Sequence, residues 1–89
     1  MIERETEIVN RLGLHARAAA KLVHTAGAYQ SRVTVCRNGE EVDAKSILGL
    51  MMMAAAQGSK VTVRCDGNDE EAAMRAVTDL IANRFDEES

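Results

Sequence analysis

A histidine and an arginine, His15 and Arg17, stand at the entrance to an alanine-rich stretch over residues 16–26. An imidazole nitrogen is nucleophilic when neutral and titrates near physiological pH, so His15 could take up a phosphoryl group and pass it on. The first N–H groups of a helix lack internal partners and carry partial positive charge, which favours an anion there. The backbone of Ala16 and the guanidinium of Arg17 are therefore the predicted phosphate-binding groups.

The spacing of apolar residues alternates between periods of two and 3.6 along the chain and predicts seven elements. Strands are expected over 2–9, 32–37, 40–44 and 60–65, and helices over 16–26, 47–53 and from 70 onward, where apolar residues recur at 73, 76, 77, 80 and 81. The Asn38-Gly39 pair predicts a type I′ hairpin. The order β-α-β-β-α-β-α suits an α+β fold with a four-stranded antiparallel sheet and three helices on one face. The other face would carry Glu3, Glu5, Thr34, Cys36 and Thr62.

The length of 89 residues predicts one small domain over 1–89, and the composition excludes several classes of protein. A net charge of −3, with one Tyr and one Phe, offers no basic or stacking surface for nucleic acid. The longest apolar run, 47–56, is too short to cross a bilayer, and the N-terminal residues do not resemble a signal sequence, so a cytoplasmic protein is expected. Cys36 and Cys65 are predicted on opposite faces of the sheet and hence as unpaired thiols.

Two motifs carry a family resemblance, Gly13-Leu14-His15-Ala16-Arg17 and Lys45-Ser46-Ile47-Leu48-Gly49-Leu50. Together with the order of elements they resemble HPr, the family of histidine-containing phosphocarrier proteins of the bacterial phosphotransferase system, over nearly the whole chain. The resemblance implies an open-faced β-sandwich in which His15 accepts a phosphoryl group on Nδ1 from enzyme I, which phosphoenolpyruvate charges, and passes it to an EIIA domain. Arg17 would balance the phosphoryl charge. Such a protein is a carrier without a cofactor rather than an enzyme, and a monomer would suit a shuttle that meets two partners through one face.

One residue inside the first motif departs from the family pattern. Members of the family usually place proline directly after this arginine, whereas this chain has Ala18. Proline in the first turn of a helix costs no hydrogen bond and fixes φ in advance. Alanine restores an N–H donor and loosens the turn, and the sequence leaves open whether the rate of transfer rises or falls.

Two groups of residues are predicted to dock partners. Arg17, Lys21 and His24 share one stripe of a helix and could meet an acidic partner, although an ordinary solvated face explains Lys21 and His24 equally well. The segment 47–53 is apolar nearly all round, but a short helix on a sheet buries only one stripe of side chains. Leu50 and Met53 are therefore expected in the core, with Ile47, Leu48 and Met51 outside. The alternative is that every apolar side chain of this segment is core. In the family the same helix and the residues around the histidine dock both partners. The predicted partner-binding residues therefore also include Leu14, Ala20, Ile47, Leu48 and Met51.

Ser46 precedes the apolar segment and is a good N-cap residue, which by itself explains a serine there. The resemblance adds a second role, because many HPr proteins are phosphorylated at this serine by an ATP-dependent HPr kinase. A phosphate beside a docking patch would repel an acidic partner without refolding the chain. The sequence is compatible with both roles of Ser46, as an N-cap residue alone and as a phosphorylation site.

The sequence leaves the branch of the family open and allows two functions of other classes. The sugar-transport and nitrogen-regulatory branches of the family share the histidine chemistry. A purely regulatory interaction domain, like HPr-like proteins that keep the serine and lack the histidine, ranks lower because His15 is present. An acid–base enzyme lacks a second catalytic group near His15 in sequence and any cofactor motif. No metal site is predicted, since His24 lies nine positions after His15, which puts the two side chains on opposite sides of the helix.

Overall fold

The computed structural model describes residues 1–89, and the predicted order of strands and helices is confirmed. The strands are β1 (Ile2–Glu7), β2 (Arg32–Arg37), β3 (Glu40–Asp43) and β4 (Lys60–Asp66), and the helices are α1 (Ala16–Gly27), α2 (Ile47–Met53) and α3 (Glu70–Ala82). A short 3₁₀ turn, η1 (Arg84–Asp86), follows α3 and was not predicted. The first strand also ends earlier than expected, at Glu7 rather than Val9.

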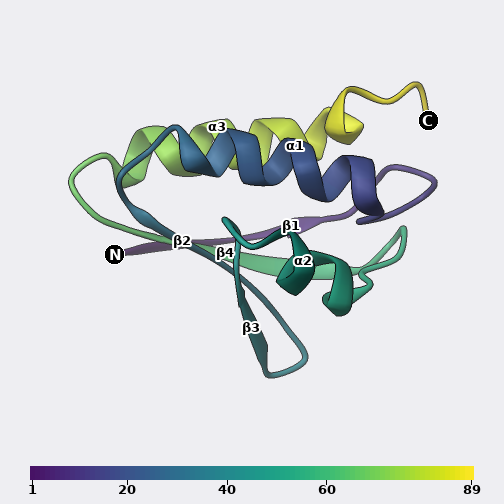
Figure 1. The fold of residues 1–89 in the computed structure, drawn as a ribbon, viewed down its shortest axis with the longest axis horizontal. Helices are drawn as coiled ribbons and strands as arrows, with labels where there is room; N and C mark the ends of the chain where they lie inside the picture. The colour runs from purple at the N-terminus through teal and green to yellow at the C-terminus, as the bar shows by residue number, and fades with distance from the viewer.

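All three strand pairs are antiparallel, in the order β1-β4-β2-β3. Helices α1 and α3 lie side by side over the sheet, and α2 packs beside α1 near β3 (Figure 1). The predicted four-stranded open sheet with three helices is therefore confirmed. None of these helices combines the length and the apolar character that a membrane crossing requires.

The β2–β3 hairpin turns at Asn38 and Gly39, which both have positive φ, 51° and 83°. A type I′ turn requires positive φ at both central residues, so this prediction is confirmed. In the neighbouring pair of strands, Val33 lies opposite Cys65 and Cys36 opposite Thr62. Because Cys65 is buried and Cys36 only half-buried, the two thiols lie on different faces and both are free, as predicted.

One core of 20 buried residues lies between the sheet and the helices. Alternate residues of β2 and β4 point into it, which is the pattern expected of a sheet with one covered face. In α3 the buried face is centred on Met74, Val77 and Thr78, whereas Leu80 is only half-buried. The predicted positions 73, 77 and 81 are thus confirmed, whereas 76 and 80 lie at the border of the buried face, which is turned toward Met74 and Thr78. Phe85 in η1 is fully buried and closes the core beyond the end of α3.

Candidate functional site

The loop that delivers His15 is fixed by its backbone. Gly13 has φ +68°, and a Cβ on it would lie 2.5 Å from the carbonyl oxygen of Ala55. The next amide, of Leu14, donates to that same carbonyl at 2.8 Å, and the His15 amide donates to the Gly13 carbonyl at 2.9 Å. Glycine is required here by both its φ and the close approach of a second loop.

His15 is the N-cap residue of α1, with extended backbone (φ −79°, ψ 179°) and a side chain that does not cap the helix. The first helical hydrogen bond runs from the Ala19 amide to the His15 carbonyl at 2.8 Å. The three preceding amides, of Ala16, Arg17 and Ala18, have no backbone acceptor, and Arg17 is exposed and outside every ion pair. The structure thus places free N–H donors directly after His15 and an unpaired cation, Arg17, in the same first turn of α1, an arrangement that suits an anion.

The imidazole also contacts the carboxylate of Glu87, which was not predicted from the sequence. His15 Nε2 is paired with Glu87 Oε2, and the two side chains are 26% and 13% exposed. The other oxygen, Oε1, accepts a hydrogen bond from Asn10 Nδ2 at 3.0 Å, and the same Nδ2 donates to the Gly13 carbonyl at 2.7 Å. Burial alone would raise the pKa of Glu87. Hydrogen bonds from Asn10 and His15, with the charges of His15 and Lys21, outweigh it and hold that pKa below its usual range.

Glu87 reaches the histidine because the segment after α3 folds back onto α1. The side chain of Phe85 is anchored in the core, and its carbonyl accepts a hydrogen bond from Lys21 Nζ at 2.8 Å. Lys21 was predicted as a partner-binding residue, and that role stays a prediction. The structure shows it half-buried, where it holds the turn that carries Glu87.

The exposed apolar side chains of α2 form a patch close to the histidine. Ile47, Leu48 and Met51 are exposed while Leu50 and Met53 are buried, so the predicted division of this helix is confirmed. Two further exposed residues, Leu12 (61%) and Met52 (81%), extend the predicted set. We call the five exposed residues the apolar patch: Leu12, Ile47, Leu48, Met51 and Met52.

The remaining predicted docking residues divide between surface and core. Ala20 and His24 are exposed on α1. Leu14 is only 4% exposed and packs in the core, yet it also lines the hollow beside His15, so its docking role stays a prediction. Its amide donates to the Ala55 carbonyl, which holds this loop against the segment that follows α2.

A shallow hollow of about 300 Å³ joins the histidine to the apolar patch. Its lining is apolar except for His15 and includes Leu12, Ala16, Met51 and Ala54–Ala56. An apolar side chain from another protein could enter this hollow and lie directly against the imidazole.

Ser46 is the N-cap of α2, as predicted, and its Oγ accepts a hydrogen bond from the Gly49 amide at 3.2 Å. The side chain is half-buried and lies immediately before the exposed Ile47 and Leu48. A change of charge at Ser46 would therefore act on the border of the apolar patch.

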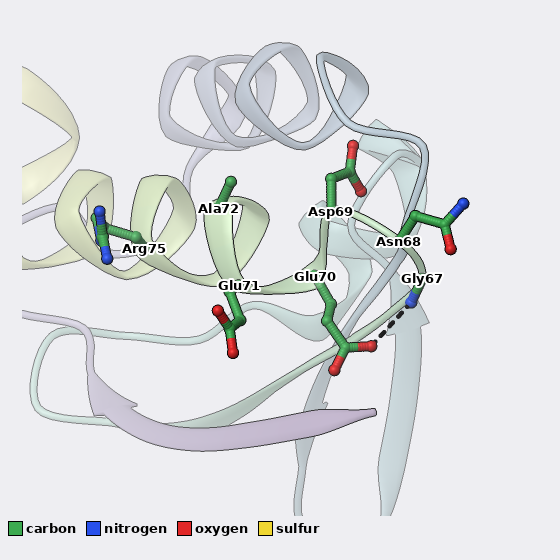
Figure 2. Close-up of a pocket in the computed structure, with 7 residues that line it drawn as sticks. All are labelled: Gly67, Asn68, Asp69, Glu70, Glu71, Ala72 and Arg75. Carbon is green, nitrogen blue, oxygen red and sulfur yellow. Dashed lines mark hydrogen bonds between the residues drawn. The ribbon is translucent and has the colours of Figure 1, made fainter.

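A larger hollow of about 570 Å³ lies at the start of α3, at the opposite end of the helical layer (Figures 1 and 2). Asp69, Glu70 and Glu71 gather there, and Glu70 accepts a hydrogen bond from the Gly67 amide. Three carboxylates repel a phosphoryl group, so this hollow is no alternative to the site at His15.

Several residues of the site escaped prediction from the sequence, among them Glu87, Phe85 and Leu12. Glu87 and Phe85 lie about 70 positions from His15, and no periodicity links distant segments of this kind. Leu12 is an isolated leucine in a polar loop, which is by itself unremarkable on a protein surface. Its position one residue before the glycine of the histidine motif was the signal that could have singled it out.

Comparison with known proteins identifies the family. Residues 2–83 match the family described as "PTS HPr component phosphorylation site". The phosphocarrier protein HPr of Cupriavidus necator is 59% identical over 87 residues, 98% of each chain. The crystal structure of HPr from Thermoanaerobacter tengcongensis superposes with a TM-score of 0.96 at 44% identity over all of both chains. Crh of Bacillus subtilis, a catabolite-repression protein solved as a swapped dimer, gives a TM-score of 0.76 at 34% identity, covering 94% of this chain and 97% of Crh. This chain belongs to the HPr family of phosphocarrier proteins of the phosphotransferase system.

Proposed function

We propose that His15 accepts a phosphoryl group on Nδ1 from phosphorylated enzyme I and delivers it to an EIIA domain. The observation that carries the proposal is the imidazole at the open start of α1, beside three free amides and the unpaired guanidinium of Arg17. These groups supply positive potential where three phosphoryl oxygens would lie. The chain is then a carrier in the cytoplasm, not an enzyme, because its partners supply the rest of the catalysis.

The chemistry required of the carrier is modest. Phosphoryl transfer depends on positioning and on balancing charge, so a small protein can serve as a relay between two larger partners. A phosphoimidazole is labile enough to pass the group onward. Arg17 balances the charge of the bound group, and the amides of Ala16 and Arg17 bind its oxygens.

The apolar patch supports the proposed docking of both partners. All five side chains of the patch are exposed, and two of them, Leu12 and Met51, line the hollow beside His15. Exposed apolar surface marks an interface, and methionine adapts to differently shaped partners. Ala20 and His24 are exposed on α1, where their spacing puts them on one side of the helix with Arg17. One surface would then meet both partners in turn, which a monomer allows. The dimers solved for Crh and for HPr of Thermoanaerobacter tengcongensis are properties of those proteins.

Regulation at Ser46 is the second part of the proposal. HPr kinase/phosphorylase would add a phosphate there that carries about −1.5 to −2 charges at neutral pH. The start of a helix tolerates that charge, so the fold of α2 would persist. The apolar patch beside it would bind an acidic partner less well.

The test of transfer uses purified enzyme I, phosphoenolpyruvate and this chain, with ³¹P NMR as the readout. A signal of Nδ1-phosphohistidine in the wild type that is lost in His15→Ala supports the carrier. Adding an EIIA domain should then discharge the signal. No phosphoimidazole in the wild type would overturn the carrier and favour a purely regulatory domain.

The test of regulation uses HPr kinase and ATP. Labelling of the wild type that disappears in Ser46→Ala supports it. Equal labelling of both, or none in either, would overturn it.

A further inference from the structure

We infer that Glu87 is a positioning residue for phosphoryl transfer, which holds the imidazole of His15 through Nε2 and so reserves the lone pair of Nδ1 for phosphorus. The inference rests on the proposed function of His15. It concerns a residue outside the family match, which ends at residue 83.

The carboxylate of Glu87 is held at both of its oxygens. Oε2 contacts His15 Nε2, and Oε1 accepts from the buried amide of Asn10. Since Asn10 also donates to the Gly13 carbonyl, the carboxylate is joined to the loop that delivers the histidine. A carboxylate bound in this way fixes the ring as well as the proton on it.

The chain adopts an unfavourable backbone to bring Glu87 there. Three consecutive residues other than glycine, Arg84, Phe85 and Asp86, have positive φ of 57°, 52° and 63°. Such a conformation persists only where the surroundings enforce it, and here the buried Phe85 side chain and the Lys21 hydrogen bond do so. A turn of this kind next to a nucleophile indicates a role in the site beyond closing the core.

The state of the carboxylate decides which ring nitrogen carries the proton. With its pKa below the usual range, Glu87 is ionised at neutral pH and only accepts hydrogen bonds. In the neutral form of the ring, which is the form that can attack phosphorus, the proton is therefore on Nε2. Nδ1 is left with a free electron pair, which is the nucleophilic form.

The transfer step then balances without moving a proton. The lone pair of Nδ1 forms a bond to phosphorus while the bond from phosphorus to the donor nitrogen of phosphorylated enzyme I breaks, and the donor keeps that electron pair. The ring of His15 gains positive charge with its Nε2 proton in place, and the carboxylate of Glu87 stabilises it. On delivery the electron pair returns to Nδ1 and the charge disappears.

The experiment compares Glu87→Ala and Glu87→Gln with Glu88→Gln, a change at the exposed neighbouring residue. Steady-state phosphorylation by enzyme I should show kcat reduced about tenfold or more in Glu87→Ala with KM nearly unchanged, because positioning is lost while docking is kept. Glu87→Gln keeps an acceptor oxygen and loses the charge, so its kcat should fall less. Glu88→Gln should match the wild type.

A second readout does not depend on transfer. In ¹⁵N NMR of the unphosphorylated protein at neutral pH, the Nε2 proton of His15 should be protected from exchange in the wild type and Glu88→Gln, and lost to exchange in Glu87→Ala. Thermal unfolding of each variant identifies any that fails to fold, and Glu87→Gln remains informative if Glu87→Ala does.

The outcomes separate the two proposals. A wild type that takes up no phosphoryl group would overturn the carrier, while the NMR signal still tests the contact. Equal kcat in the wild type and both Glu87 variants, with an unchanged Nε2 proton, would overturn only the role of Glu87.

Discussion

The ammonium group of Lys21 donates a hydrogen bond to the carbonyl of Phe85, with 2.8 Å between Nζ and oxygen, and ties α1 to the turn that follows α3. The two residues are 64 positions apart in the chain. This bond joins a helix that begins at the histidine to the segment that carries Glu87. The folding of the last residues is therefore linked to the site.

Replacing Lys21 by methionine should lower the free energy of unfolding by about 1 kcal/mol, because methionine keeps the apolar stem and loses the charged donor. Chemical denaturation measures the change. The control is Lys60→Met, whose exposed ammonium forms no ion pair. An equal effect of the two variants would contradict a role for this bond.

Gly13→Ala should destabilise the chain by about 1–2 kcal/mol or more, since alanine is strained at positive φ and its Cβ would meet the Ala55 carbonyl. Gly27→Ala is the matched control. Gly27 lies in α1, and a Cβ added to it would meet no atom within 4 Å, so alanine there should stabilise by roughly 0.5–1 kcal/mol. Urea unfolding should show the two shifts with opposite signs.

Ala18→Pro should raise the free energy of unfolding by roughly 0.4–1 kcal/mol, by restricting the unfolded chain. Ala18 is the third residue of α1, and its amide has no backbone acceptor, so the substitution removes no hydrogen bond. An unchanged or lower unfolding midpoint would show that the buried site cannot accommodate the proline ring.

Stability should fall in acid partly through Asp69. A hydrogen bond from the Ser31 hydroxyl, followed by one from the Gln30 amide, holds the pKa of Asp69 below its usual range. Because the folded pKa is the lower one, the unfolded chain binds the proton more readily. The contribution is complete above the unfolded value of about 3.9 and is lost as pH falls through the folded value.

Asp69→Asn should therefore flatten the dependence of unfolding free energy on pH in this acidic range. Urea titrations between pH 2 and 7 measure it. Asp79→Asn, at an exposed position of α3, provides the comparison. An unchanged slope in Asp69→Asn would contradict the assignment.

Leu48→Glu should weaken binding to enzyme I about tenfold, equivalent to about 1.4 kcal/mol, while the free energy of unfolding changes little, because Leu48 is 69% exposed. Calorimetric titration and thermal unfolding separate the two effects. Ala72→Glu adds the same charge near the start of α3, at the opposite end of the helical layer from the apolar patch, and should leave binding unchanged. Loss of the fold without a separate binding defect would indicate that Leu48 is needed for the core.

The elements could be predicted where the chain repeats a local pattern. Alternation in β2 and β4 identified the covered face of the sheet, and Asn38-Gly39 fixed the hairpin, because both signals act between near neighbours. The division of α2 into buried Leu50 and exposed Leu48 followed from its short length. His15 and Arg17 were recognisable by type and spacing together.

The rest of the site depends on contacts that no local pattern contains. The turn at Phe85 has positive φ without glycine, so its sequence contains no signal that the chain folds back there onto α1. Lys21 looked like a surface cation because its acceptor is a backbone carbonyl brought there by that turn. The position of Glu87 depends on this turn and on the Lys21 hydrogen bond, since its carboxylate reaches His15 only once Phe85 is buried.

The order of the strands leaves β1 and β3 at the two open edges of the sheet. Three of the six residues of β1 and three of the four residues of β3 are acidic. Strand edges offer unpaired backbone groups to other chains, and like charges placed opposite one another oppose such pairing. Two copies that met edge to edge would bring carboxylates together, so the acidic borders protect this protein from aggregating through its own sheet at high concentration.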